Sequence, residues 1–125
     1  MNSKRGETLI TLLVFMVVAI TVTTSAAMII MNDSLNATKF QVGQDASYVA
    51  ESGVEEAILR LLRDPSYTGG TLTVGSGTAT IAVTGTTIKT ITSVGKVNNH
   101  SRKIQVTAGY TGGVVAVTPP WQEVP

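Results

Sequence analysis

The 125-residue sequence contains no cysteine, which excludes a disulfide framework and thiolate metal sites. It has one histidine, His100, and a single imidazole without a second histidine or a thiolate does not make a metal site. The formal net charge is +1, so the chain lacks the large basic excess on which nucleic-acid binding depends. We therefore expect no metal and no cofactor, and we consider nucleic acid a possible but disfavoured partner.

The sequence also gives little support for catalysis by paired carboxylates. Glu51, Glu55 and Glu56 lie close together, but no histidine or further acid cluster accompanies them. A solvated helix face explains these carboxylates better than a catalytic pair does. We therefore predict that the protein is not an enzyme, with no catalytic residues.

One long stretch, Leu9 to Met31, is free of Lys, Arg, Asp, Glu, Pro and Gly. As a helix it is about as long as the ~30 Å hydrocarbon core of a bilayer is thick. It is also longer than the roughly 7–15 apolar residues of a cleaved secretory signal. Lys4 and Arg5 precede it, which predicts an N-terminus in the cytoplasm and a C-terminal part outside.

The residues before this stretch resemble a known family. Lys4-Arg5-Gly6 followed by Glu7-Thr8-Leu9-Ile10-Thr11-Leu12-Leu13 is similar to the start of a type IV prepilin or pseudopilin. The resemblance implies a membrane precursor in the cytoplasmic (inner) membrane that a prepilin peptidase cuts between Gly6 and Glu7. A peptide bond at the membrane face must enter the peptidase active site in extended form, and glycine has no side chain that would obstruct this. An uncleaved signal anchor is the competing interpretation.

The resemblance further implies assembly into a cell-surface pilus or pseudopilus through the apolar helix. Its implied partners are other pilin subunits, the peptidase, the inner-membrane assembly platform and, before assembly, membrane lipid. The residues that we expect to mediate assembly are large, apolar and spread over the segment: Leu9, Leu12, Leu13, Phe15, Val18 and Ile20.

The match has departures. Family members typically have an apolar residue first after the cut and glutamate fifth, whereas this chain has Glu7 first and Thr11 fifth. The K-type minor pseudopilins resemble this chain in lacking that glutamate. In those proteins the absence of the glutamate goes with a place at the filament tip. Major pilins often carry a helix-breaking proline where this chain has Met28, so local melting of the helix is not implied.

Beyond Met31 nothing stops the helix until Asp64-Pro65. Glu56 and Arg60 have the spacing of a helical ion pair. The segment Ala50–Ala57 resembles the minor-pilin and K-type branch, and Gly53 and Ala57 would let a sheet or another helix pack close to the backbone. Apolar or small residues recur at helical spacing and predict one buried stripe: Ala46, Val49, Ala50, Gly53, Val54, Ala57, Ile58, Leu61 and Leu62.

From Tyr67 onward the sequence is rich in Thr, Val, Ile and Gly, which favours short strands. We predict strands at 71–74, 78–84, 87–94 and 102–108, with turns at 75–77, 85–86 and 95–101 and a further edge strand at 114–117. The predicted fold is α+β: a long N-terminal helix, spanning a membrane in its first half and amphipathic in its second, packed on a small antiparallel sheet. The divisions are a leader (1–6), an assembly helix (7–31), an amphipathic helix (32–64), a sheet (65–118) and an exposed, extended tail (119–125).

Five residues are candidate surface contacts. Four gather around one predicted turn and could meet an anionic surface: Lys96, His100, Arg102 and Lys103. Trp121 could anchor a partner, because aromatic residues are enriched at binding hot spots. A solvated hairpin and a packed or free tail are the alternatives.

The function expected from the sequence is a structural subunit, minor rather than major, of a type IV pilus or a type II secretion-like pseudopilus. One alternative is a signal-anchored surface binding module that never assembles. Another is a tip subunit with an adhesive or DNA-binding role.

Overall fold

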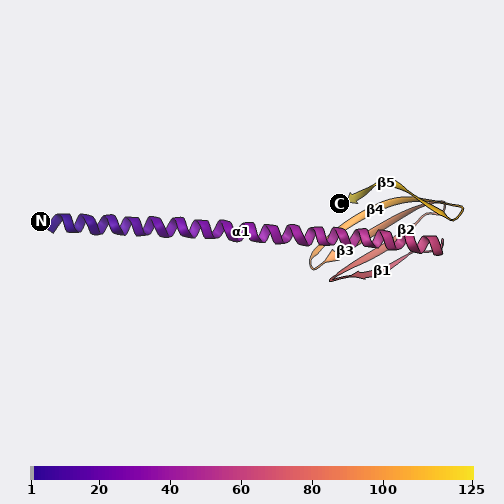
Figure 1. Cartoon of the computed structure of the whole chain (residues 1–125), viewed down its shortest axis with the longest axis horizontal. Coiled ribbons are helices and arrows are strands. Elements are labelled where there is room, and N and C mark those ends of the chain that lie inside the picture. The colour runs from indigo at the N-terminus through magenta and orange to yellow at the C-terminus, as the bar shows by residue number, and fades with distance from the viewer. Residues whose placement is uncertain (1) are drawn as a thin grey trace. The chain divides into compact units, whose positions relative to one another are not determined.

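The structure, a computed structural model, describes residues 2–125. One helix, α1 (Asn2–Arg63), is followed by five strands (Figure 1). The contacts divide the chain into two compact units, Met1–Thr38 and Lys39–Pro125. The first unit is helical throughout its described residues, and the second contains the remainder of α1 together with the whole sheet.

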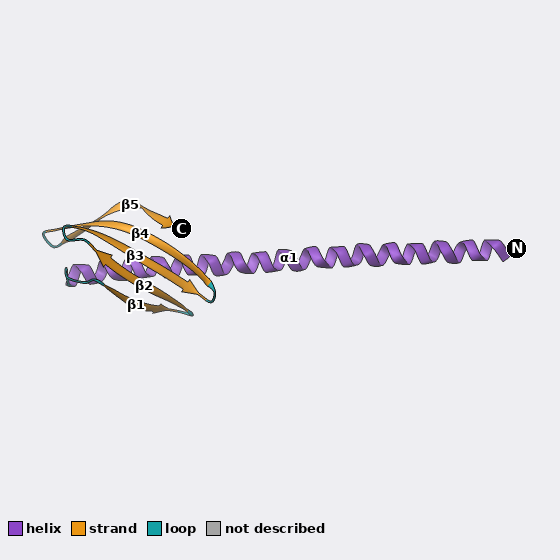
Figure 2. Cartoon of the chain, turned by 180° about the vertical axis from the view of Figure 1, so that it is seen from behind, coloured by secondary structure: helices purple, strands orange, loops and turns teal. Residues whose placement is uncertain are grey.

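The sheet is an antiparallel meander in the order β1-β2-β3-β4-β5. Its strands are β1 (Gly69–Val74), β2 (Gly77–Thr84), β3 (Ile88–Val97), β4 (His100–Thr111) and β5 (Val114–Val124). The second half of α1 lies along one face of this sheet, while the other face carries no further layer of the described chain (Figure 2). The α+β fold with an antiparallel sheet, predicted from the sequence, is confirmed.

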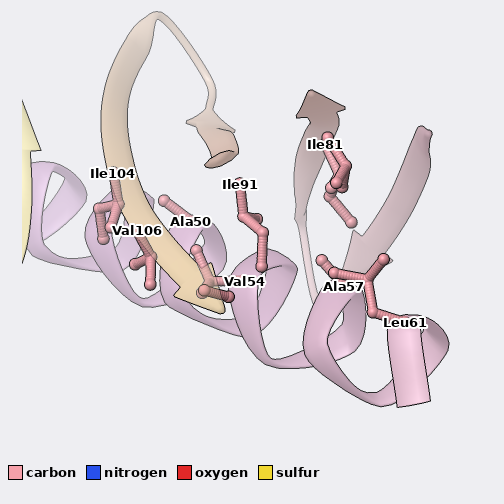
Figure 3. Packing of buried hydrophobic residues seen from close by; sticks show 10 residues of the cluster. Ala50, Val54, Ala57, Leu61, Ile81, Ile91, Ile104 and Val106 are labelled. Atoms are coloured by element: carbon pink, nitrogen blue, oxygen red, sulfur yellow. The ribbon is translucent and has the colours of Figure 1, made fainter. Parts of the chain in front are cut away.

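The core forms between the helical stripe and the inward side chains of the strands. Strand β2 alternates strictly between buried and exposed residues, as a strand with one covered face must. Figure 3 shows side chains of α1 and of three strands meeting in this core. The largest fully buried apolar side chains are Leu61, Ile91, Val54 and Val106.

Small residues allow α1 and β3 to approach closely. A Cβ atom at Gly95 of β3 would overlap the backbone of Ala46 and Ala50 in α1. A Cβ atom at Gly53 would overlap the Ser93 hydroxyl and lie 2.9 Å from the Ala79 Cβ. The predicted role of Gly53 in close packing is therefore confirmed.

Two helix expectations need correction. Leu62 was assigned to the buried stripe but is 46% exposed, because it lies about 100° around the helix from Leu61, which is fully buried. The helix also begins at Asn2, so the leader residues from Asn2 to Gly6 continue α1.

The predicted turn at 95–101 is too long. Gly95 lies inside β3 because its missing side chain lets the strand cross the helix backbone. The chain turns at Asn98, which adopts φ 52°, a left-handed conformation that asparagine tolerates better than most residues. Strand β4 then starts at His100.

The tail predicted at 119–125 is also wrong in part, since β5 extends to Val124. Its pairing with β4 shifts register between Gln105 and Thr107. Pro119 and Pro120 fall opposite this irregularity, and proline is tolerated there because an edge strand needs only half of its hydrogen bonds.

Candidate functional site

The apolar segment of the first unit is uncovered by the described chain. The six side chains expected to mediate assembly are all exposed, from 53% for Val18 to 73% for Phe15: Leu9, Leu12, Leu13, Phe15, Val18 and Ile20. A contiguous exposed apolar surface of this kind is typical of segments that contact lipid or protein. The helix is long and apolar enough to cross a membrane.

The hydroxyl groups of this segment are satisfied within the helix. Thr23 donates a hydrogen bond of 2.7 Å to the carbonyl oxygen of Ala19, and Thr24 donates one of 2.8 Å to that of Ile20. Thr21 and Ser25 bond back in the same way. These threonines therefore bring no unpaired donor into an apolar environment.

The expected processing bond, between Gly6 and Glu7, lies inside α1. Glu7 is exposed, and a Cβ atom at Gly6 would meet nothing within 4 Å. Packing therefore does not explain the glycine. A peptidase that binds extended substrates would have to unwind this first part of the helix, where the first four N–H groups lack helical acceptors.

The four candidate contact residues near the β3–β4 turn divide between the two faces of the sheet. Lys96 and Lys103 follow the exposed alternation of β3 and β4 and point away from α1. His100 pairs with the buried Val97 on the helix side. The predicted cluster therefore does not form one patch.

Arg102 also lies on the helix side and already has a partner. Its Nη1 donates a 2.9 Å hydrogen bond to Oε1 of Glu123 in β5, and both side chains are about half exposed. A Cβ atom at Gly43 of α1 would lie 3.3 Å from the Arg102 Nη2. Arg102 thus connects β4 to β5 and lies beside α1 at Gly43, which precedes the helix stripe.

Trp121 is 39% exposed and belongs to neither hydrophobic cluster of the described residues.

The predicted ion pair on the helix is confirmed, with 2.7 Å between Arg60 Nε and Glu56 Oε1. Arg60 also lies over the ring of Tyr67, 5.5 Å from its centroid. Within residues 2–125, no group of three or more acidic or histidine side chains is placed to hold a metal ion.

Sequence reasoning did not single out as a candidate site the outer sheet face, which we define as the face of the sheet turned away from α1. The alternate threonines of residues 71–92 were the available signal, but the strand register was needed to align them. Thr84, Thr90, Thr107 and Thr118 form one row across β2, β3, β4 and β5. The other outward threonines of the strands are Thr71, Thr73, Thr78, Thr80, Thr92 and Thr111.

Comparison with known proteins identifies no relative: no family model, no curated protein and no solved structure matches the chain.

Proposed function

We propose that the protein is a structural subunit, minor rather than major, of a type IV pilus or a type II secretion-like pseudopilus. It is made as a membrane precursor, cut after Gly6 and assembled through its apolar N-terminal helix. It performs no covalent chemistry of its own.

The observation that carries the proposal is the uncovered apolar helix directly after a basic leader that ends in glycine. The whole apolar window of α1 is unburied in the chain itself, so it must be covered from outside. A membrane covers it first, and sister helices replace lipid on assembly. The small residues and internally bonded hydroxyls around Thr21 to Ala27 permit such close helix packing in lipid.

The sheet supports a structural role as well. Its inward face is occupied by the α1 stripe, and its only described ion pair joins two of its own strands. A monomeric signal-anchored surface module shares these features but keeps its leader. The DNA-binding alternative loses support, because Arg102 is paired with Glu123 on the helix side of the sheet, which leaves only Lys96 and Lys103 of the expected cluster on a common face.

The test is the mature N-terminus of the protein isolated from membranes of cells that carry a prepilin peptidase. Mass spectrometry should find a chain that starts at Glu7, with or without an N-methyl group. The Gly6→Val variant should keep its leader, while Gly109→Ala, a glycine substitution far from the cut, should be processed normally. An uncut wild-type chain that stays monomeric in detergent and in cells would refute the proposal and favour the signal anchor.

A further inference from the structure

The sheet and the helix of the second unit carry opposite charges. Residues 69–124 contain four Lys or Arg side chains and a single carboxylate, Glu123. Residues 39–64 contain three cations and five carboxylates. Glu123 lies on the helix side of the sheet, where it pairs with Arg102. The outer sheet face therefore presents no carboxylate side chain among its described residues.

Two cations do lie on this face. Val94 of β3 is paired with Lys103 of β4, and Lys96 lies two residues further along β3, opposite Ser101. Lys96 and Lys103 are thus diagonal neighbours on one face, a relationship that separates Cα atoms by about 7–8 Å. Both are exposed, and neither has a salt-bridge partner in the described part of the chain.

Hydroxyl and amide groups surround this lysine pair. Thr80 and Val94 continue the row of Lys103, and the next row contains Thr92, Gln105 and Gln122. Neighbouring strands lie about 4.8 Å apart, so these rows present hydrogen-bonding groups at regular intervals. No aromatic side chain interrupts the rows that these residues form.

We propose that the outer sheet face binds an acidic polysaccharide, with the Lys96–Lys103 pair contacting its carboxylates and the Thr and Gln rows contacting its hydroxyl groups. Charge complementarity supports this partner, since the face has two cations without an ion-pair partner in the described chain and no carboxylate side chain to repel a polyanion. Duplex DNA is less suitable: it carries one charge per ~1.7 Å and is typically held by several phosphate contacts. The proposal does not depend on filament assembly, because the face belongs to the single chain.

The experiment uses the full-length chain in non-ionic detergent micelles and measures its binding to polygalacturonate, to neutral dextran and to duplex DNA at two salt concentrations. We expect polygalacturonate to bind better than dextran, and more weakly at higher salt. The double variant Lys96→Gln/Lys103→Gln should lose about five- to tenfold in affinity, as two exposed charge pairs are worth.

Two further variants give the controls. Lys39→Gln/Arg63→Gln removes the same charge from exposed helix positions and should change affinity less than about twofold. Thr92→Val/Thr107→Val removes two outward hydroxyls at nearly constant volume and should weaken polygalacturonate binding without affecting any residual dependence on salt. Circular dichroism checks that each variant is folded.

Three results would overturn the proposal. Equal binding of dextran and polygalacturonate would show that charge is not recognised. Equal losses in the sheet and helix variants would show a non-specific charge effect. Tighter binding of DNA, lost in the Lys96/Lys103 variant, would replace the polysaccharide with nucleic acid. Each result leaves the cleavage test of the proposed function unaffected.

Discussion

Gly53 of α1 lies so close to Ser93 of β3 that a Cβ atom on the glycine would overlap the serine hydroxyl. The same Cβ would lie 2.9 Å from the Ala79 Cβ and 3.3 Å from the Ser93 Cβ. At this point α1 can pack so closely on the sheet only because Gly53 has no side chain. The distance between α1 and β3 depends on this contact.

We therefore predict that Gly53→Ala destabilises the second unit. Alanine favours a helix by about 1 kcal/mol over glycine, but overpacking costs about 1–3 kcal/mol, so the net loss should be about 1 kcal/mol. Thermal unfolding of the full chain in non-ionic detergent, followed by circular dichroism, measures it. Higher stability of the variant would contradict the packing argument.

Alanine substitutions at two other glycines, Gly95 and Gly109, allow a comparison with Gly53→Ala. At Gly95 the added Cβ would overlap the helix backbone, which cannot rotate away, so Gly95→Ala should cost at least about 3 kcal/mol. At Gly109 the nearest atom would be 3.9 Å away. Gly109→Ala should therefore be neutral or stabilising by about 0.5 kcal/mol, through the lower entropy of the unfolded chain. From most to least stable, the predicted order of the three variants is Gly109→Ala, Gly53→Ala and Gly95→Ala.

Removing the Ser93 hydroxyl should stabilise the protein. Ser93 is fully buried, and its Oγ has no hydrogen-bond partner in the described chain. An unpaired buried hydroxyl costs about 1–3 kcal/mol, and Ser93→Ala removes it with little change in volume. We expect a gain of about 1 kcal/mol in the free energy of unfolding. Ser101→Ala, at an exposed site of β4, is the control and should change little. A loss on Ser93→Ala would mean that the hydroxyl has a partner.

The helix and most strands could be predicted from the sequence because their patterns are local. Ala46, Val49, Ala50 and Val54 repeat at helical spacing, and all are buried as predicted. The apolar segment Leu9 to Met31 could also be predicted, because its composition is a local feature of the sequence. The strand at 102–108 likewise alternates between apolar and polar residues, and Ile104 and Val106 are buried.

Features that depend on register could not be predicted. Lys96 and Arg102 seemed to share one turn, but the pairing of Gly95 with Arg102 turns their side chains to opposite faces. Glu123 was assigned to a tail because Pro119 and Pro120 precede it, yet it lies in β5 opposite Ile104. Only the three-dimensional pairing brings Arg102 to Glu123 and aligns the outward threonines in rows.

The Arg102–Glu123 ion pair should hold the end of β5 without adding much to global stability. Both side chains are about half exposed, and pairs of this kind contribute about 0.2–1 kcal/mol. Glu123→Gln should therefore lower global stability by less than about 1 kcal/mol, yet speed amide hydrogen exchange at Val124 several-fold. Exchange at Val106, in the core, should be unchanged. Equal acceleration at both positions would show that the pair stabilises the whole unit.

Asp64, just after the end of α1, should make part of the stability depend on pH. The Ser66 hydroxyl and then the Ser66 backbone N–H donate hydrogen bonds to its carboxylate, and they lower its pKa below the usual 3.8. Lys89 adds a smaller effect in the same direction. Because the folded-state pKa is the lower one, the contribution is present above about pH 3.8 and is lost as pH falls through the folded-state pKa.

Asp64→Asn should consequently be less stable than the wild type at pH 6, and the difference should shrink as the pH is lowered toward 2. Ser66→Ala removes the largest cause and should raise the Asp64 pKa part of the way toward its usual value, measured by NMR titration of the side-chain carboxyl. Ser76→Ala, in the exposed β1–β2 turn, serves as the control for a lost serine hydroxyl. If the wild type and Asp64→Asn differ by the same amount at pH 2 and pH 6, the Ser66 hydrogen bonds do not favour the ionised carboxylate. The stability of the turn after α1 would then not depend on the ionisation of Asp64, and its backbone bonds, among them the 3.1 Å bond that the Tyr67 N–H donates to the Asp64 carbonyl oxygen, would hold it equally at both pH values.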